Sequence, residues 1–166
     1  LWVAGCGARR LAGARSLAQP GAYRLGGLNL DGFGSPHGRM GGRRFGNAPG
    51  WRWSQGGLNF AHLGATAGPI SGAEQGLLGR PDVLILGVGG GSKIFDGDEA
   101  AALVNQLNPK RVIPVQYVIG EPPEGCDQGG VQPFLDAMAG TTVRKVGRSI
   151  SLPGQLDDST VVTVMN

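Results

Sequence analysis

The chain has 166 residues and a formal net charge of +3, with 40% hydrophobic and 16% charged residues. This length allows one domain of ordinary size, and the balance excludes an intrinsically disordered chain. No apolar run reaches the roughly 18 residues needed to cross a membrane, so we expect a soluble protein without a membrane partner. Glycine is the outlier at 32 residues, about 19% where about 7% is usual, which predicts many turns.

The N-terminal residues 1–22 are predicted to be irregular, and residues 23–166 to form one incomplete domain. The chain begins at Leu1 and lacks the continuous apolar core of a secretory signal. Arg, Ala and Gly dominate this stretch, with no acidic residue before Asp31. That composition suits either an organelle transit peptide or the edge of a truncated domain, and we expect the second.

Two cysteines, Cys6 and Cys126, lie far apart in the sequence without a CxxC spacing. This arrangement argues against both a disulfide scaffold and a zinc ribbon. We therefore expect two free thiols in a reducing compartment, and a cytoplasmic protein.

Short strands and turns are predicted over residues 21–47, where turn residues alternate with short apolar stretches. The segment WRWSQGGLNFAHLG, residues 51–64, predicts a β-hairpin, because two arms with large side chains flank a Gly-Gly turn. No helix is expected over residues 21–47.

A strand, a helix and a second strand are predicted from residue 81 onward. PDVLILGVGGG and KRVIPVQYV are apolar runs on either side of DGDEAAALVNQLNP, which has helical periodicity. Asp96 or Asp98 can cap the helix, and Pro109 ends it. Its buried face is predicted to be Ala101, Leu103, Val104 and Leu107. Because both strands are unbroken apolar runs, they are expected to be parallel and covered on both faces, as in an α/β fold.

The rest of the chain predicts a short helix over residues 131–140 and three closing strands. These strands are TTVRKV, SISL and STVVTVMN.

The segment LGVGGGSK, residues 86–93, follows a strand and precedes a helix, which is the context of a phosphate-binding loop. It does not match the P-loop pattern, because Ser92 precedes Lys93 and Ile94 follows it. We expect a close-packed strand-to-helix turn.

An arginine-rich stretch, SPHGRMGGRRFGNAPGWRW, interleaves cations with aromatic residues. Its candidates for binding an anion are Arg39, Arg43, Arg44 and Arg52. Such a mixture can contact phosphates and stack on bases. The net charge of only +3 argues against nucleic acid as the partner and favours solvated or tryptophan-stacked arginines.

The supply of metal ligands is small. A dinuclear hydrolytic site needs about five or six His, Asp or Glu ligands, and the chain has only two histidines, His37 and His62. They form no HxH, HxxxH or HExxH pair. The carboxylates of Asp96, Asp98 and Glu99 are explained by helix capping.

Three linked segments, GGLNFAHLGATA, PDVLILGVGGG and EAAALVNQLNPKRVIPVQY, resemble the second half of the metallo-β-lactamase superfamily. The resemblance covers about residues 23–146. It is to the branch of predicted Zn-dependent hydrolases similar to L-ascorbate-6-phosphate lactonase, and particularly to cyanobacterial members with GGRRFG and WRW segments. It implies an αββα sandwich of two similar halves, of which this chain supplies the C-terminal half or two-thirds, with the N-terminal part missing.

At most of the positions where the resemblance implies a metal ligand, this chain has a residue that cannot bind the metal well. The mid-chain ligand histidine falls on His37, which keeps at most a vestigial role. The bridging aspartate of His-x-Gly-Asp falls on Ala65, and the last ligand histidine, of Pro-x-His-Tyr, falls on Gln116. His62 lies beside the family's site without being a ligand, so we expect it to be structural, with no catalytic residue and no bound cofactor.

Three hypotheses of function follow. The first is a pseudoenzyme that keeps the fold for binding or structure. The second is an active metal-dependent hydrolase of a phosphoester or lactone, with zinc held by ligands from the missing N-terminal half. The third is a binder of anionic ligands through the four arginines. The expected partner is the missing half of the fold or a second copy.

Overall fold

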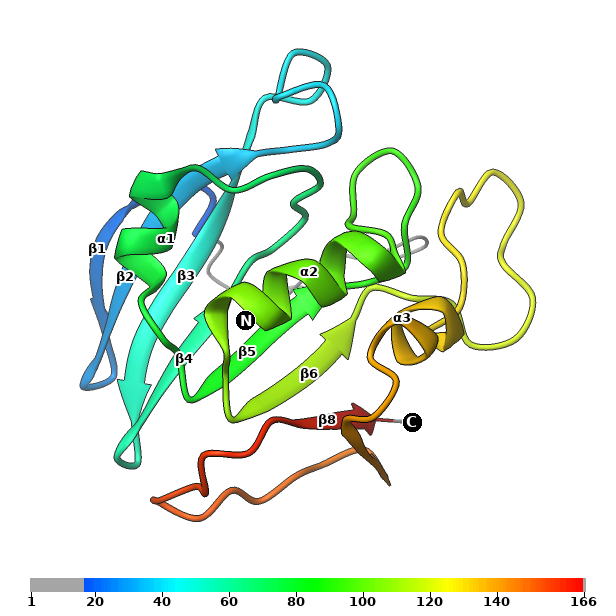
Figure 1. Cartoon of the computed structure of the whole chain (residues 1–166). Helices are drawn as coiled ribbons and strands as arrows, with labels where there is room; N and C mark the ends of the chain where they lie inside the picture. Colours follow the sequence, from blue (N-terminus) through cyan, green and yellow to red (C-terminus); the bar gives the residue numbers. More distant parts are fainter. Residues whose placement is uncertain (1–16, 166) are drawn as a thin grey trace.

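The computed structural model describes residues 17–165 of the chain. Within this range an eight-stranded sheet has the order β1-β2-β3-β4-β5-β6-β8-β7 (Figure 1). The strands are β1 (Gly21–Leu25), β2 (Leu28–Pro36), β3 (Asn47–Gln55), β4 (Leu58–His62), β5 (Val83–Gly87), β6 (Arg111–Val115), β7 (Thr142–Val146) and β8 (Val161–Met165). The helices are α1 (Gly72–Leu78), α2 (Gly97–Leu107) and α3 (Gln132–Ala137). The predicted α/β class is confirmed.

The first four strands form an antiparallel meander. Two Gly-Gly turns connect β1 to β2 and β3 to β4, and both glycines of each turn have positive φ, 58° and 81° at Gly56 and Gly57. Positive φ at both central positions matches the right-handed twist of the flanking strands. The predicted hairpin is confirmed, with Trp51 opposite His62.

The second half of the sheet is parallel, from β4 through β5, β6 and β8 to β7. Helix α2 connects β5 to β6 and is capped at its N-terminus by Asp96, whose side chain accepts a hydrogen bond from the Glu99 backbone N–H at 3.0 Å. Its C-cap is Asn108, which is in the left-handed conformation with φ 46°. The four residues predicted for its buried face are all buried. The predicted parallel strand-helix-strand unit is confirmed.

The three helices lie on the same face of the sheet (Figure 1). One hydrophobic core joins this face to residues of all three helices, including Leu78 of α1, Val104 of α2 and Phe134 of α3. None of the helices described over residues 17–165 is long and apolar enough to cross a membrane.

The opposite face of the sheet carries a smaller core of Leu58, Val83, Ile113 and Leu156. The predicted strand SISL is wrong: residues 149–152 form no strand. Instead, the half-buried side chains of Ile150 and Leu152 pack against this smaller core. Alternating apolar and polar residues are typical of a strand. Here the same alternation occurs in an irregular segment, whose apolar side chains pack against the sheet.

Helix α1 was not predicted from the sequence. It is held by a capping box, in which the Ser71 hydroxyl accepts from the Glu74 N–H at 3.2 Å and the Glu74 carboxylate accepts from the Ser71 N–H at 2.6 Å. The spacing Ser-x-x-Glu is the sequence signal for this motif. It is easily overlooked here because the helix has only seven residues and two of them are glycine.

We expect Ser71→Ala to lower the free energy of unfolding by about 1 kcal/mol, because the first turn of α1 loses its side-chain acceptor. Urea denaturation followed by circular dichroism measures this change. Ser151→Ala, in an exposed stretch without secondary structure, is the matched control and should leave stability unchanged. Equal effects of the two substitutions would contradict the capping role.

Cys126 is disulfide-bonded. The prediction of free thiols is therefore wrong for Cys126, while Cys6 lies outside the described residues. Distance along the sequence does not limit which cysteines approach each other in the fold. The cytoplasmic location was predicted from free thiols, whereas disulfides form and persist in oxidising compartments. Cys126 therefore no longer supports that prediction.

Candidate functional site

The candidate site lies at the edge of the sheet where β2, β4, β5 and β6 end. Strands β4, β5 and β6 are parallel, so their C-terminal ends share one edge. Strand β2 has the same direction as β4, because both are antiparallel to β3. Ligand sites of α/β sheets form at such carboxyl ends. We call this edge, with residues 37–46, 63–71, 88–96 and 116–131 that follow the four strands, the loop edge.

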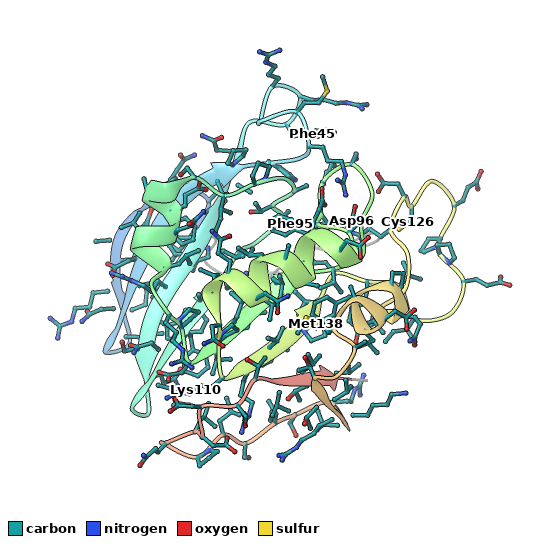
Figure 2. The ribbon with its side chains drawn as sticks, viewed as in Figure 1. Phe45, Phe95, Asp96, Lys110, Cys126 and Met138 are labelled. Carbon is teal, nitrogen blue, oxygen red and sulfur yellow. The ribbon has the colours of Figure 1, made fainter. Side chains whose placement is uncertain are left out.

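Backbone hydrogen bonds join the segments of the loop edge. The Arg39 N–H donates to Ser92 O at 3.2 Å, and the Phe95 N–H donates to Thr66 O at 3.0 Å. The Gly129 N–H donates to Gly89 O at 2.7 Å. Figure 2 shows Phe45, Phe95 and Asp96 on this side of the molecule. His37, Ala65 and Gln116 therefore lie on three segments that are each bonded to the segment after β5.

His37 directly follows β2 and is half-buried. Its backbone N–H donates to Gly46 O at 2.9 Å, and its Nε2 is buried without a hydrogen-bond partner among the described residues. Its pKa is lowered, first by burial and then by the positive charge of Lys93. The imidazole is therefore neutral at pH 7, as a ligand must be, but the same ammonium group opposes a second cation.

The other two positions at which the resemblance predicts metal ligands offer weak donors or none. Ala65 presents a methyl group, which has no lone pair. Gln116 follows β6 with φ 54° and buries its amide oxygen, and a neutral amide is a poor ligand for first-row transition metals. Within residues 17–165, no three His, Cys, Asp or Glu side chains are grouped so that they could hold a metal ion. The residues described do not fit a zinc site.

His62, at the end of β4, is only 3% exposed. Its Nδ1 accepts a hydrogen bond from the Gly64 N–H at 2.8 Å, and burial lowers its pKa to about 4. Gly64 has φ 60°, and a Cβ there would lie 2.6 Å from Pro49 O. His62 thus orders the turn that leads from β4 to Ala65, which agrees with the structural role expected for it.

The glycine-rich segment after β5 is closely packed against the segment after β6. A Cβ on Gly89 would overlap Gln116 O and lie 3.0 Å from Tyr117 Cα, and one on Gly91 would lie 2.7 Å from Asp127 O. The Asp127 carboxylate accepts from the Ser92 N–H at 2.7 Å, and this bond lowers its pKa. The packing agrees with the predicted strand-to-helix turn, although no sequence pattern pointed to Asp127.

The Arg39 side chain binds residues at the start of helix α2 and in the glycine-rich segment. It donates to Gly91 O at 2.8 Å and forms ion pairs with Asp96, at 3.2 Å, and Glu99. The hydrogen bond with Glu99 is the main cause of its raised pKa. Its charge is therefore balanced within the protein.

The four candidate arginines do not form one cluster. Arg52 lies on β3, away from the loop edge, where it pairs with Asp31 on β2 at 3.2 Å and donates to Leu77 O. Arg43 and Arg44 are exposed on the segment after β2, and neither forms an ion pair within residues 17–165. Of the four candidates, Arg43 and Arg44 are therefore the two whose charges no described acidic side chain pairs with.

Comparison with known proteins shows similarity to one superfamily. The sequence profile of the beta-lactamase superfamily domain matches residues 8–116. Among curated proteins, none is similar enough to count as a match.

Several solved structures resemble the chain. A proposed Zn-dependent hydrolase of the metallo-beta-lactamase superfamily from Thermotoga maritima is 25% identical, with a TM-score of 0.71, and the match covers 92% of this chain and 73% of that one. The metallo-beta-lactamase fold protein YhfI from Bacillus subtilis is 9% identical, with a TM-score of 0.55, covering 87% and 50%. A proposed metal-dependent hydrolase from Parabacteroides distasonis is 15% identical, with a TM-score of 0.55, covering 75% and 52%. The chain thus spans from half to three-quarters of their lengths, and the expected metallo-β-lactamase-like architecture is confirmed.

Proposed function

Because the chain belongs to the beta-lactamase superfamily, we propose that it is a member without a working metal site, which keeps the fold for a binding or structural role. We further propose that it belongs to the branch similar to L-ascorbate-6-phosphate lactonase and resembles cyanobacterial members of that branch. One observation carries the proposal: the loop edge has a methyl group at Ala65 and an amide at Gln116 where the resemblance requires a carboxylate and an imidazole.

Electrostatics support this proposal. Two adjacent divalent cations repel each other strongly unless a carboxylate bridges them, and Ala65 cannot do so. Lys93 adds a positive charge beside His37, which is the family ligand position that keeps its side chain. The loop edge therefore suits a negatively charged ligand better than a pair of metal ions.

An active hydrolase is the second candidate. Its support is the similarity to the Thermotoga maritima protein, which is 25% identical over 92% of this chain. Such an enzyme would need zinc ligands from parts of the protein outside the described residues, and a phosphoester or a lactone as substrate. The predicted partner, an upstream half of the fold or a second copy, stays a prediction.

The test is the zinc and manganese content of the full-length protein purified without chelators, measured by elemental analysis. We expect close to no metal in the native protein. The double variant Ala65→Asp/Gln116→His restores the carboxylate and the imidazole, and it should take up metal.

The matched control is Ala139→Asp/Gln155→His, which makes the same two changes at exposed positions away from the loop edge. This control should remain metal-free, and circular dichroism should show that all variants are folded. Stoichiometric metal in the native protein would overturn the proposal and make a hydrolase assay the next step.

A further inference from the structure

Strand β7 lies at one end of the sheet and pairs on one side only. Its neighbour is β8, to which it runs parallel, and no other strand among residues 17–165 pairs with it. The N–H and C=O groups on its outer side therefore have no strand partner within that range. An exposed strand of this kind is a template to which a strand of another chain can add.

The side chains of β7 are exposed on both faces of the sheet. Its first four residues are exposed, and Val143 keeps 39% of its surface accessible. Val143 and Lys145 are level with Val162 and Val164 of the main core, so they lie on the face that carries the helices. Arg144 lies between them on the opposite face. Both faces of β7 can therefore contact an added strand.

The surface around β7 is positively charged. Arg144, Lys145 and Arg148 are exposed, and none forms an ion pair within residues 17–165. The sequence between Asp136 and Asp157 contains no acidic residue. We call residues 142–148 the β7 edge. Its cations favour a partner of opposite charge, because complementary charges select one partner against others.

The opposite end of the sheet is less suited to an added strand. Strand β1 directly follows Pro20, which has no N–H to donate. It begins with Gly21 and Ala22, whose small side chains offer little packing surface, and it carries a single cation, Arg24. The β7 edge is therefore the better candidate for strand addition.

A second copy of the chain is an unfavourable occupant of the β7 edge. If two β7 strands paired antiparallel over all five residues, Arg144 would face Arg144, and Val143 would face Lys145. Like charges directly opposite each other destabilise a strand pair. An acidic strand instead places two consecutive carboxylates opposite Arg144 and Lys145, one on each face of the sheet.

We propose that the β7 edge binds an extended acidic segment of a partner protein, which adds to the sheet as a further strand. Backbone hydrogen bonds supply the affinity, and carboxylates opposite Arg144 and Lys145 supply the selectivity. The proposal goes beyond the loss of the metal site and does not depend on it, because residues 142–148 are not part of the loop edge.

Fluorescence anisotropy of a labelled peptide, TVEEVT, titrated with the full-length protein tests the proposal. We expect saturable binding that weakens as ionic strength rises from about 0.05 to about 0.15 M. The same peptide with every backbone amide N-methylated keeps its carboxylates but cannot donate backbone hydrogen bonds, so it should not bind. Hydrogen exchange followed by mass spectrometry should slow over residues 142–146 when TVEEVT is bound.

The double variant Arg144→Gln/Lys145→Gln should weaken peptide binding roughly tenfold, because two opposite-charge cross-strand pairs are lost. The matched control is Arg43→Gln/Arg44→Gln, which removes two adjacent exposed charges on the segment after β2. This control should leave peptide binding unchanged, and circular dichroism should show that both variants are folded. Equal weakening by the two variants, or equally tight binding of the N-methylated peptide, would overturn the proposal.

Two results with the native protein would also overturn it. The first is the absence of saturable TVEEVT binding, which would leave the proposed loss of the metal site intact, because metal content is measured separately. The second is a native dimer, detected by light scattering, that the peptide dissociates. That result would assign the β7 edge to a second copy of the chain.

Discussion

We expect the protein to lose about 3 kcal/mol of stability as the pH falls from 7 to about 4, because His62 must be neutral in the folded state. Its pKa is about 4 in the fold against 6.5 for an ordinary histidine. Between these values the unfolded chain binds a proton that the folded chain does not, so stability falls as the pH falls. The contribution is complete above pH 6.5 and is lost progressively as the pH falls through this window.

Urea denaturation at a series of pH values between 7 and 4.5 measures this effect. His62→Asn should flatten the dependence, because its amide oxygen can still accept from the Gly64 N–H but does not titrate. His37→Asn is the control: its pKa is also lowered, but it is only half-buried, so its removal should leave most of the dependence. Asp82, Asp127 and Asp157 also have lowered pKa values, but they lose their contributions only below about pH 4. An unchanged slope in His62→Asn would disprove the assignment.

The substitution Gly89→Ala should destabilise the fold by about 3 kcal/mol, the upper range for overpacking. A Cβ at this position would overlap Gln116 O and press against Tyr117 Cα, and both are backbone atoms that cannot rotate away. The change would force apart the segments after β5 and β6. Thermal unfolding and urea denaturation both measure the loss.

Gly76→Ala provides a control with the opposite expected sign. Gly76 lies within α1, and a Cβ there would meet no atom within 4 Å. Alanine should therefore raise stability by about 0.5–1 kcal/mol through its higher helix propensity. Similar losses for Gly76→Ala and Gly89→Ala would mean that close backbone packing is not the cause.

Three features that the sequence did not indicate share a non-local cause. SISL has the alternation of a strand, yet it pairs with no strand, and its apolar side chains pack against the smaller core instead. Free thiols were predicted from the spacing of Cys6 and Cys126, yet Cys126 is disulfide-bonded. Arg39 was a candidate for binding anions, and its ion pair with Glu99 joins residues 60 positions apart.

The sequence alone determined the elements of this fold that depend on local physics. Hydrophobic periodicity and the Gly-Gly turn were sufficient to predict the β3–β4 hairpin and the β5–α2–β6 unit. The face of an element on which a side chain lies, and the positive φ of a turn glycine, depend only on neighbouring residues. It also specified the chemistry at Ala65 and Gln116. Only the tertiary structure decided which charges remain available, because ion pairing depends on distances in space. It paired Arg39 and Arg52 within the protein and brought Lys93 from the segment after β5 to the ring of Phe45.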